Sequence, residues 1–198
     1  MNIQAIEDRR SIRRFRQETV SEEMLRQVLE AARIAPSSKN DQPWEFQVWG
    51  PESRDRALGA MDSVVREGVS GAETDPGRRK MLAGVAHTLR VMKQAPVLIG
   101  IVRPGGTDPF GEVSGFDRVT ELLEAVSVGA AVENMLLEAC AMGLGTLWIG
   151  YTFLTYDAVC NALEISGQLL GVVALGWPDE NPVPRPRKSM EEIVRYLP

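Results

Sequence analysis

The segment Arg9-Arg10-Ser11-Ile12-Arg13-Arg14-Phe15 (RRSIRRF) concentrates guanidinium groups and a hydroxyl close to the N-terminus. A guanidinium group presents a planar fork of donors that matches phosphate, and a serine hydroxyl adds a small donor that can approach closely. The segment therefore predicts an anion site. A solvated basic turn is the alternative interpretation of such a charge run.

A second basic cluster stands at the far end of the chain, at Arg185-Pro186-Arg187-Lys188. Pro186 stiffens the backbone, so the arginines point either outward or at a ligand. Basic clusters at opposite ends of the sequence suggest a single phosphate site that joins the two ends. We expect Arg187 and Arg9 to contact that phosphate together.

The composition restricts the class of protein. The chain has 198 residues, of which 44% are hydrophobic, and this is enough for one α/β or α+β domain over residues 1–198. The net charge is −5 and the isoelectric point is near 5.1, so we expect no general surface for nucleic acid or an anionic membrane. The basic clusters are local features of an acidic protein, which fits a small anionic ligand.

Neither the cysteines nor the histidine form a metal-binding pattern. Cys140 and Cys160 lie in apolar, helix-like stretches without CxxC spacing, and His87 is the one histidine. The first residues lack the basic-then-apolar pattern of a signal peptide, and polar residues interrupt the longest apolar region, 122–147. The sequence is typical of a reduced, cytoplasmic protein with no metal and no membrane span.

Hydrophobic periodicity predicts helices that alternate with strands. Ser21 is expected to cap a helix that stops before Pro36, and Ser189 with Glu192 forms a capping box. Further helices are predicted at residues 3–6, 53–61, 78–93, 117–142 and 155–163, and strands at 45–49, 96–102, 147–149 and 169–175.

The remaining segments are predicted loops. Residues 36–44 form a polar loop bracketed by prolines, Gly50 and Pro51 form a turn, and residues 68–77 and 103–115 are glycine-rich loops. Helix 117–142 is apolar on more than one face and ends before Gly143, so we expect it to be the buried central helix.

The chain resembles the FMN-dependent nitroreductase family along nearly its whole length. Four blocks in the family's order carry the resemblance: residues 9–15, the loop 36–44, the segment 134–149 and the basic cluster 185–188. The resemblance implies an α+β, nitroreductase-like fold, with a mixed central sheet flanked by helices. It also implies a domain-interlocked homodimer with FMN in pockets at the subunit interface.

The resemblance also assigns the cofactor contacts, with NADH or NADPH as the reductant. The N-terminal arginines and serine would bind the phosphate, the ribityl chain or the pyrimidine edge of the flavin, and the C-terminal arginines would close on the phosphate. The loop before the first strand would reach the flavin of the other subunit, and the backbone after the third strand would lie beside flavin N5. The implied cofactor-binding residues are Arg9, Arg10, Ser11, Arg13, Pro36, Ser37, Ser38, Asn40, Gln42, Trp148, Ile149, Gly150, Arg185 and Arg187.

The implied reaction passes a hydride from NAD(P)H through flavin N5 to a nitroaromatic, quinone or similar acceptor by a ping-pong mechanism. No residue resembles a nucleophile with a positioned base, as expected if the cofactor carries the chemistry. The alternatives are dehalogenation, dehydrogenation or flavin fragmentation on the same fold, and a non-catalytic protein that only binds flavin or another anion.

The sequence departs from the family at one contact. Many relatives carry an asparagine on the helix before the second strand, where this chain has His87 or Thr88. The segments 68–77 and 103–115 lie where relatives vary most, and they are expected to influence the substrate. Trp44 and Trp148 can equally be packing residues, and Asn134 can satisfy a neighbouring backbone carbonyl instead of contacting flavin.

Overall fold

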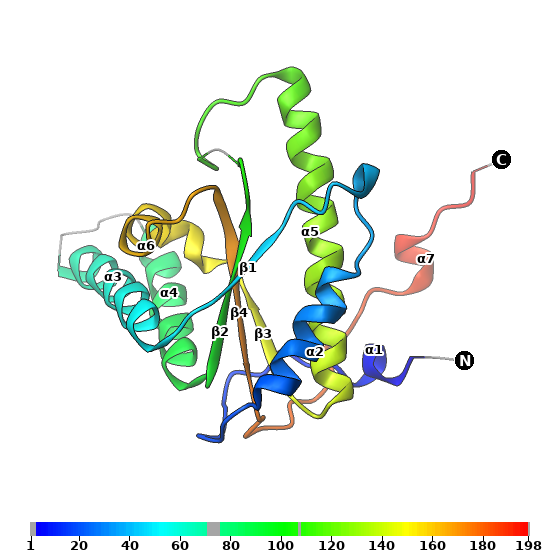
Figure 1. Cartoon of the computed structure of the whole chain (residues 1–198), viewed down its shortest axis with the longest axis horizontal. Coiled ribbons are helices and arrows are strands. Elements are labelled where there is room, and N and C mark those ends of the chain that lie inside the picture. Colours follow the sequence, from blue (N-terminus) through cyan, green and yellow to red (C-terminus); the bar gives the residue numbers. More distant parts are fainter. Residues whose placement is uncertain (1–2, 71–75, 107, 198) are drawn as a thin grey trace.

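A computed structural model describes residues 3–70, 76–106 and 108–197, and contains a sheet between two helical layers (Figure 1). The strands are β1 (Glu45–Val48), β2 (Val97–Arg103), β3 (Gly145–Ile149) and β4 (Gln168–Gly176), in the order β1-β2-β4-β3. These strands pair antiparallel, and a parallel bridge between Ser11 and Thr146 makes the sheet mixed at its β3 edge.

One helical layer contains α2 and α5, and the other contains α3, α4 and α6, with the short α1 and α7 at the periphery (Figure 1). None of the described helices is long and apolar enough to cross a lipid bilayer. The helices are α1 (Gln4–Asp8), α2 (Glu22–Arg33), α3 (Pro51–Ser70), α4 (Pro76–Gln94), α5 (Gly115–Ala141), α6 (Tyr156–Leu163) and α7 (Met190–Ile193), with 3-10 turns η1 (Ser38–Asn40) and η2 (Tyr151–Thr155).

The predicted helix ends are confirmed wherever a side chain or a glycine marks them. The Ser21 hydroxyl accepts a hydrogen bond from the Met24 amide at 3.2 Å, and α2 begins directly after it. The capping box of Ser189 and Glu192 opens α7. Gly143 follows the end of α5 with a left-handed φ of 79°, which an L side chain adopts only with strain.

Two predicted boundaries around α3 are wrong. Pro51 was expected in a turn but is the first residue of α3, a position where its missing amide proton costs nothing. α3 also runs past residue 61, and Gly68 lies inside it rather than in a loop. A Cβ on Gly68 would lie 2.5 Å from a Leu82 methyl, so the glycine permits close packing of α3 and α4. The rest of the predicted loop 68–77 belongs to these helices, apart from residues 71–75, which lie outside the described residues.

Strand and loop limits also shift where pairing extends an element. β3 begins at Gly145 rather than residue 147, because Gly145 pairs with Gly176 of β4. β2 includes Arg103 and α5 begins at Gly115, so the predicted loop 103–115 is shorter at both ends. β1 ends one residue before Trp49.

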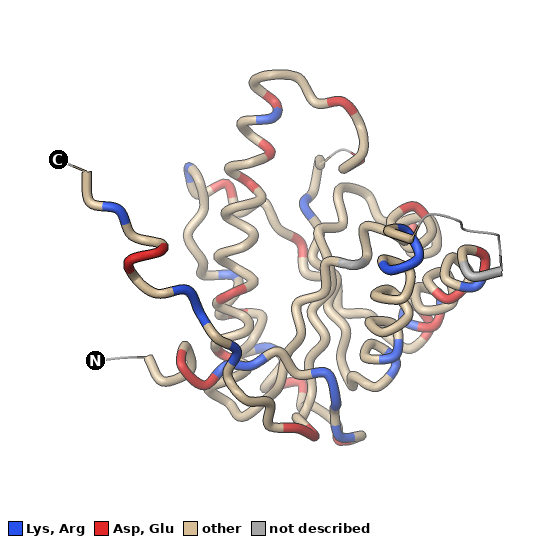
Figure 2. Tube along the Cα trace, turned by 180° about the vertical axis from the view of Figure 1, so that it is seen from behind, with Lys and Arg blue, Asp and Glu red and all other residues tan. Residues whose placement is uncertain are grey.

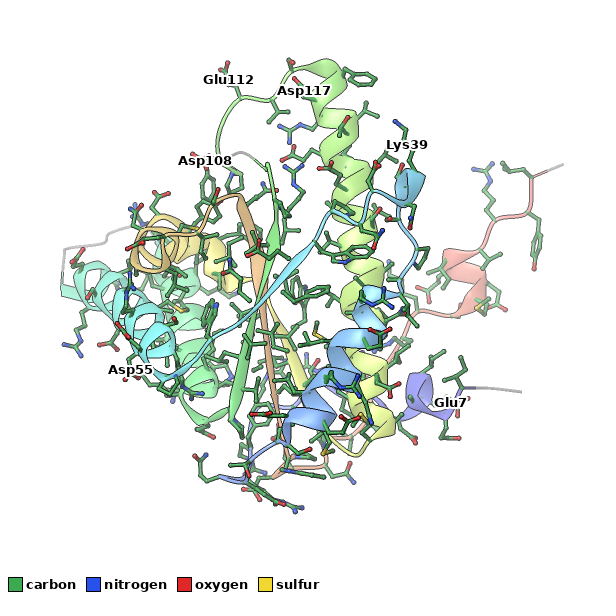
Figure 3. The ribbon with its side chains drawn as sticks, in the orientation of Figure 1. Glu7, Lys39, Asp55, Asp108, Glu112 and Asp117 are labelled. Carbon is green, nitrogen blue, oxygen red and sulfur yellow. The ribbon has the colours of Figure 1, made fainter. Side chains whose placement is uncertain are left out.

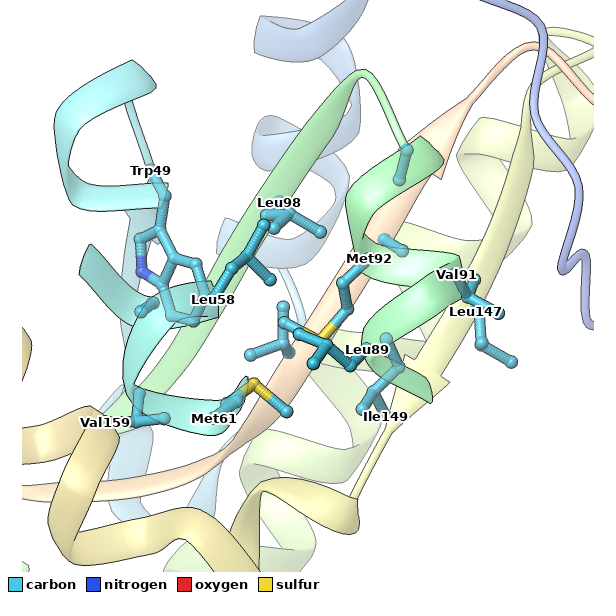
Figure 4. Packing of buried hydrophobic residues seen from close by; sticks show 14 of the residues in the cluster. Trp49, Leu58, Met61, Leu89, Val91, Met92, Leu98, Leu147, Ile149 and Val159 are labelled. Carbon is cyan, nitrogen blue, oxygen red and sulfur yellow. The ribbon is translucent and has the colours of Figure 1, made fainter. Parts of the chain in front are cut away.

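The hydrophobic core lies on both faces of the sheet. Leu98 and Val102 of β2 pack toward α3 and α4, whereas Ile99 and Ile101 pack toward α2 and α5. Successive side chains of a strand point to opposite faces, so a strand buried on both faces is a continuous apolar run. Figure 4 shows the first of these clusters, where α4 lies against β3 through residues such as Val91 and Leu147.

Helix α5 is buried over only part of its length in the single chain. Its C-terminal half packs against α2, and Ala131, Met135 and Ala139 are inaccessible to solvent. Its N-terminal half exposes Phe116 by 81% and Val126 by 73%. The expectation of a fully buried central helix is therefore wrong for one chain.

Candidate functional site

The basic N-terminal segment runs along the free edge of β3. Beside the parallel bridge of Ser11 and Thr146, the Ile12 amide donates to the Thr146 carbonyl at 2.9 Å. A Cβ on Gly145 would lie 2.8 Å from the Ile12 side chain, so glycine is required for this close approach. The contact between these distant segments fixes the arginines relative to the sheet.

The chain after β4 holds the other side of the same segment. The Arg16 amide donates to the Trp177 carbonyl, and the Asp179 amide donates to the Arg14 carbonyl, both at 2.9 Å. The Glu180 carboxylate accepts from the amides of Arg13 and Arg14 at 2.5 and 3.2 Å. The N-terminal segment is therefore held between β3 and residues 177–180, which lead into the C-terminal arm, residues 181–197.

A hollow of about 580 Å³, named here the α4–β3 hollow, lies where α4 faces the end of β3. The predicted residues Arg13, Trp148, Ile149 and Gly150 meet here. Gly84, His87, Thr88 and Leu147 complete the lining. Both positions at which the sequence departs from the resembled family, His87 and Thr88, therefore lie in this hollow.

The backbone of β3 offers open hydrogen-bonding groups beside the hollow. Alternate residues of a strand direct their N–H and C=O groups to the same edge. Because the Thr146 carbonyl bonds Ile12 at the free edge, the backbone groups of Trp148 point to that edge as well. Gly150 leaves open space where a Cβ would stand. A flat ligand with polar edges can bond to this edge.

Arg13 is the arginine in the lining of the α4–β3 hollow, and none of the described lining residues carries a carboxylate. Its guanidinium donates to the Ser11 carbonyl at 3.1 Å, which leaves further donors of the fork available. The floor beside it is apolar, since the side chains of Leu147 and Ile149 belong to the core cluster. The site suits a ligand that is mostly apolar and carries carbonyl acceptors.

Arg9 and Arg10 line a neighbouring hollow of about 440 Å³, named here the arginine hollow. Arg9 pairs with Glu133 at 3.6 Å, and Arg10 donates to the Glu7 and Arg9 carbonyls at 2.6 and 2.9 Å. Cys140 also lines this hollow, and burial raises the pKa of its thiol above the ordinary value, which makes it a poor nucleophile. The arginine hollow can bind an anion but offers no activated thiol.

Residues 36–42 of the predicted loop 36–44 lie on the other face of the sheet, against α5. The Ser38 amide donates to the Ser127 hydroxyl at 3.2 Å, and the Gln42 amide donates to the Ser37 hydroxyl at 3.0 Å. Figure 3 labels Lys39 at the tip of this loop. Within one chain, the loop does not reach the α4–β3 hollow, whose lining contains none of its residues.

This loop also carries unusual backbone strain. Lys39, Asn40 and Gln42 have φ values of 52°, 59° and 47°, in the left-handed region that residues other than glycine seldom adopt. Strain of this kind clusters at ligand and interface sites, where the surrounding structure maintains it. Periodicity in the sequence contains no signal for it.

Arg185 and Arg187 lie exposed on the C-terminal arm and line neither of these hollows. Figure 2 shows the arm leaving the body beside the N-terminal segment and extending away from it. The structure therefore brings Arg13 to Trp148, Ile149 and Gly150, and places Arg9 and Arg10 next to them, but does not bring the C-terminal arginines to either hollow.

The sequence left two interpretations open for Asn134, Trp44 and Trp148. The side-chain amide of Asn134 donates to the Ala31 carbonyl at 3.1 Å, so it satisfies the backbone of α2. Trp44 stacks on Phe46 with ring centroids 6.3 Å apart. Trp148 is 39% exposed and contributes to the hollow's lining.

Sequence reasoning missed the acidic partners of the arginines, Glu133 and Glu180, because helical or loop patterns do not indicate which distant carboxylate meets which arginine.

A larger hollow of about 990 Å³ lies between α3, α4 and α6, but none of the predicted site residues line it. Within the described ranges, no group of His, Cys, Asp and Glu side chains is placed to hold a metal ion.

Comparisons with known proteins show the family to which the chain belongs. The Nitroreductase family profile matches residues 6–177. The chain is 28% identical over 179 residues to 5,6-dimethylbenzimidazole synthase from Rhodospirillum rubrum, covering 89% of this chain and 82% of that protein. Nitrobenzene nitroreductase from Ectopseudomonas oleovorans is 26% identical over 215 residues, 97% of this chain and 95% of that one. A structure described as a nitroreductase in complex with FMN, from Desulfovibrio desulfuricans, matches with a TM-score of 0.71 at 28% identity, covering 99% of this chain and 96% of that one.

Proposed function

The chain belongs to the nitroreductase family, and from this premise we propose that it is an FMN-dependent oxidoreductase that uses NADH or NADPH to reduce a nitroaromatic, a quinone or a similar acceptor. The observation that carries the proposal is the α4–β3 hollow, where Arg13 meets the open backbone edge after Thr146. The acceptor and the choice of nicotinamide belong to the proposal alone.

The lining of the hollow fits an isoalloxazine ring. Arg13 offers guanidinium donors to the carbonyl oxygens of the pyrimidine edge, and the backbone of Trp148 offers an N–H and a C=O at the β3 edge. Leu147 and Ile149 supply an apolar surface for the ring. When bound there, FMN supplies the two-electron chemistry by accepting and donating a hydride at N5.

The phosphate is proposed to lie toward the arginine hollow. Arg9, Arg10 and Ser11 precede Arg13 along the β3 edge, so they are the nearest donors outside the α4–β3 hollow. Arg185 and Arg187 join them only if the C-terminal arm folds back or a second chain positions it. Their exposure in the single chain leaves both arginines free to move toward a ligand.

We propose a homodimer in which the strained loop 36–42 completes the cofactor pocket of the other subunit. The loop's donors lie on the opposite face of the sheet from the α4–β3 hollow of their own chain. A second copy is the simplest source of such donors for each hollow. A cytoplasmic location for this dimer is part of the same proposal.

The role of the chain's residues is to bind, orient and shield. Arg13 would orient the pyrimidine edge of the flavin ring, and the β3 backbone would orient the adjacent part of the ring. The apolar side chains beneath the ring would exclude water. A single hollow that receives the nicotinamide first and the acceptor afterwards predicts ping-pong kinetics.

The direct test is anaerobic reduction of the purified protein after reconstitution with FMN. Stopped-flow mixing with NADH or NADPH is expected to bleach the flavin absorbance within seconds, and a panel of nitroaromatics and quinones is expected to restore it. A protein that remains colourless after reconstitution contradicts the proposal. A bound flavin that neither nicotinamide reduces would favour a non-catalytic flavin-binding protein.

A second candidate function follows from one of the relatives, the 5,6-dimethylbenzimidazole synthase of Rhodospirillum rubrum. In this candidate the protein consumes its flavin rather than recycling it. Aerobic incubation of the FMN-loaded protein with NADPH distinguishes the two. Stable flavin absorbance over many turnovers supports the reductase, whereas loss of flavin with appearance of 5,6-dimethylbenzimidazole supports the synthase.

A further inference from the structure

His87 of α4 lines the α4–β3 hollow together with Arg13 of the N-terminal segment. It is the one histidine of the chain, and its side chain is exposed rather than packed in the core. Within the described part of the chain, its side chain makes no hydrogen bond or ion pair. The imidazole is thus free to interact with whatever occupies the hollow.

The rest of the lining cannot exchange a proton near neutral pH. A guanidinium group such as that of Arg13 does not give up a proton in proteins, and a hydroxyl such as that of Thr88 does not ionise near neutral pH. The other lining residues are glycines and apolar residues. Imidazole is the side chain whose charge changes between about pH 5 and 8. Among the described residues of the lining, His87 is therefore the one suited to general acid catalysis.

Charged groups lie on the elements that pack around His87. Arg13 lines the same hollow, and Arg90 lies one turn further along α4. Helix α3, which packs against α4, carries Asp62, whose carboxylate pairs with Lys93 of α4 at 3.5 Å and also with Arg66. The described side chains of η2 that pack near α4, from Thr152 to Thr155, carry no ionisable group.

We propose that His87 is the general acid of the second half-reaction, which protonates an acceptor oxygen as the acceptor is reduced. The proposal rests on the proposed reductase function. For a quinone the balance is NAD(P)H plus H⁺ plus quinone giving NAD(P)⁺ plus hydroquinone. The reductant supplies the hydride, and the imidazolium N–H supplies the separate proton to a carbonyl oxygen, which becomes a hydroxyl. Water then reprotonates the imidazole.

The kinetic test compares acceptors that do and do not need a proton. In wild type, stopped-flow reoxidation of the reduced holoenzyme by a quinone is expected to slow as the pH rises and the imidazole loses its proton. His87→Gln is expected to slow this step about a hundredfold at neutral pH, the lower range for general acid catalysis, and to remove its pH dependence. Reoxidation by ferricyanide, which takes electrons without protons, is expected to be the same in both proteins.

The matched control is Lys80→Gln, which removes an exposed cation of α4 that does not line the hollow. This variant is expected to match wild type with both acceptors. If it slows the quinone reaction as much as His87→Gln does, the effect is one of local charge and the proposal fails. An increase in the KM for quinone at unchanged kcat in His87→Gln would assign His87 to binding and also overturn it.

A spectroscopic readout tests the placement without turnover. Because the chain has one histidine, its imidazole ring protons give a single set of NMR resonances. Adding FMN to the apoprotein is expected to shift these resonances, and their titration midpoint in the holoprotein is expected to match that of the quinone rate. Resonances that FMN leaves unchanged would overturn the proposal.

The outcomes separate this inference from the function on which it rests. If NADH and NADPH both fail to reduce the flavin, the proposed function is wrong. If they reduce it normally but His87→Gln reacts with quinone at the wild-type rate and pH dependence, the reductase stands and His87 is not its acid.

Discussion

Individual residues of the basic clusters differ in how firmly the fold holds them. Arg13 lies in the hollow with its amide bonded to Glu180, and Arg9 is paired with Glu133. Arg187 is exposed on the arm. The contribution of Arg187 to cofactor binding therefore depends on the ligand or on a second chain rather than on contacts within its own chain.

Arg187→Ala is expected to weaken FMN binding about thirty- to a thousandfold, because the phosphate loses a charge-assisted partner. Riboflavin lacks the phosphate, so its affinity is expected to be the same in wild type and variant. Isothermal titration of both ligands measures this, with Lys188→Ala as the neighbouring control. Equal losses for FMN and riboflavin, or no loss for FMN, would show that Arg187 is a solvated surface residue and does not bind the phosphate.

Tyr156 predicts an alkaline limit to stability. Burial is the main cause that raises its pKa to about 12, and its hydroxyl lies 3.5 Å from the Gly167 carbonyl. In the unfolded chain a tyrosine titrates near its ordinary pKa of about 10. The buried neutral phenol therefore stabilises the native state fully below about pH 10, and this contribution is lost as the pH rises toward about 12.

Urea unfolding measured at about pH 9 and about pH 11 is expected to reveal this loss. The decrease in the free energy of unfolding is expected to be smaller in Tyr156→Phe than in wild type. Tyr196, which is 92% exposed, provides the control, and Tyr196→Phe is expected to follow wild type. Identical pH dependence in all three proteins would show that Tyr156 ionises freely in the native state.

At the scale of elements, a buried charged cluster ties the sheet to α5. Arg103 at the end of β2 donates to Gln168 of β4 at 3.0 Å, to Glu124 at 2.5 Å, and pairs with Glu121 at 3.3 Å. The side chains of Arg103 and Glu121 are only 7% and 11% exposed. The cluster joins the two ends of the connection from β2 to α5. Figure 3 labels Asp108 and Glu112 on this connection and Asp117 in the first turn of α5.

Arg103→Met is expected to lower the free energy of unfolding by about 3 kcal/mol, because the carboxylates lose their buried counter-charge. Urea titration monitored by circular dichroism measures the change. Arg33→Met breaks an exposed pair of similar geometry with Glu30, 2.6 Å apart, and little change is expected there. Equally small effects in both variants would mean that the Arg103 cluster is well hydrated.

At the scale of the whole molecule, the single chain exposes apolar surface on two parts. The first is the N-terminal half of α5, and the second is the C-terminal arm, which leaves the body with little contact to it (Figure 1). Monomeric proteins seldom expose large contiguous apolar patches. A second copy that covers both parts agrees with the proposed homodimer. The exposed residues are Phe116, Val119, Leu122, Leu123 and Val126 on α5, and Val183, Met190, Ile193, Tyr196 and Leu197 on the arm.

Light scattering is expected to give a stable dimer, with twice the chain mass of 21.8 kDa, at micromolar concentration. Obligate interfaces of this kind bury more than about 2,000 Å². Val126→Glu is expected to weaken association at least about tenfold, because it places a charge on the exposed face of α5. Val126→Thr, of similar shape, is expected to stay dimeric. A wild-type monomer would remove the basis for a shared cofactor pocket.

The amino-acid sequence by itself determined the elements whose signals are local. Ser21, the Ser189 capping box and Gly143 each satisfy or end a helix through atoms within a few residues, so their predictions are confirmed. The runs that form β2 and β4 are apolar because both faces are buried. The family, and with it the arrangement of sheet and helices, followed from motifs that the sequence presents directly.

Only the tertiary structure decided which distant residues meet. Gly68 lies inside α3, where the absence of a side chain lets Leu82 of α4 pack closely. Gly145 belongs to β3 because it pairs with Gly176 of β4, and it lets Ile12 approach the strand. Contacts between distant segments also bring His87 and Arg13 to one hollow and hold the loop 36–42 on the opposite face of the sheet. Periodicity and capping describe interactions within one turn or one strand. Packing between segments depends on the shape and distance of partners far away in the chain, which these local patterns do not encode.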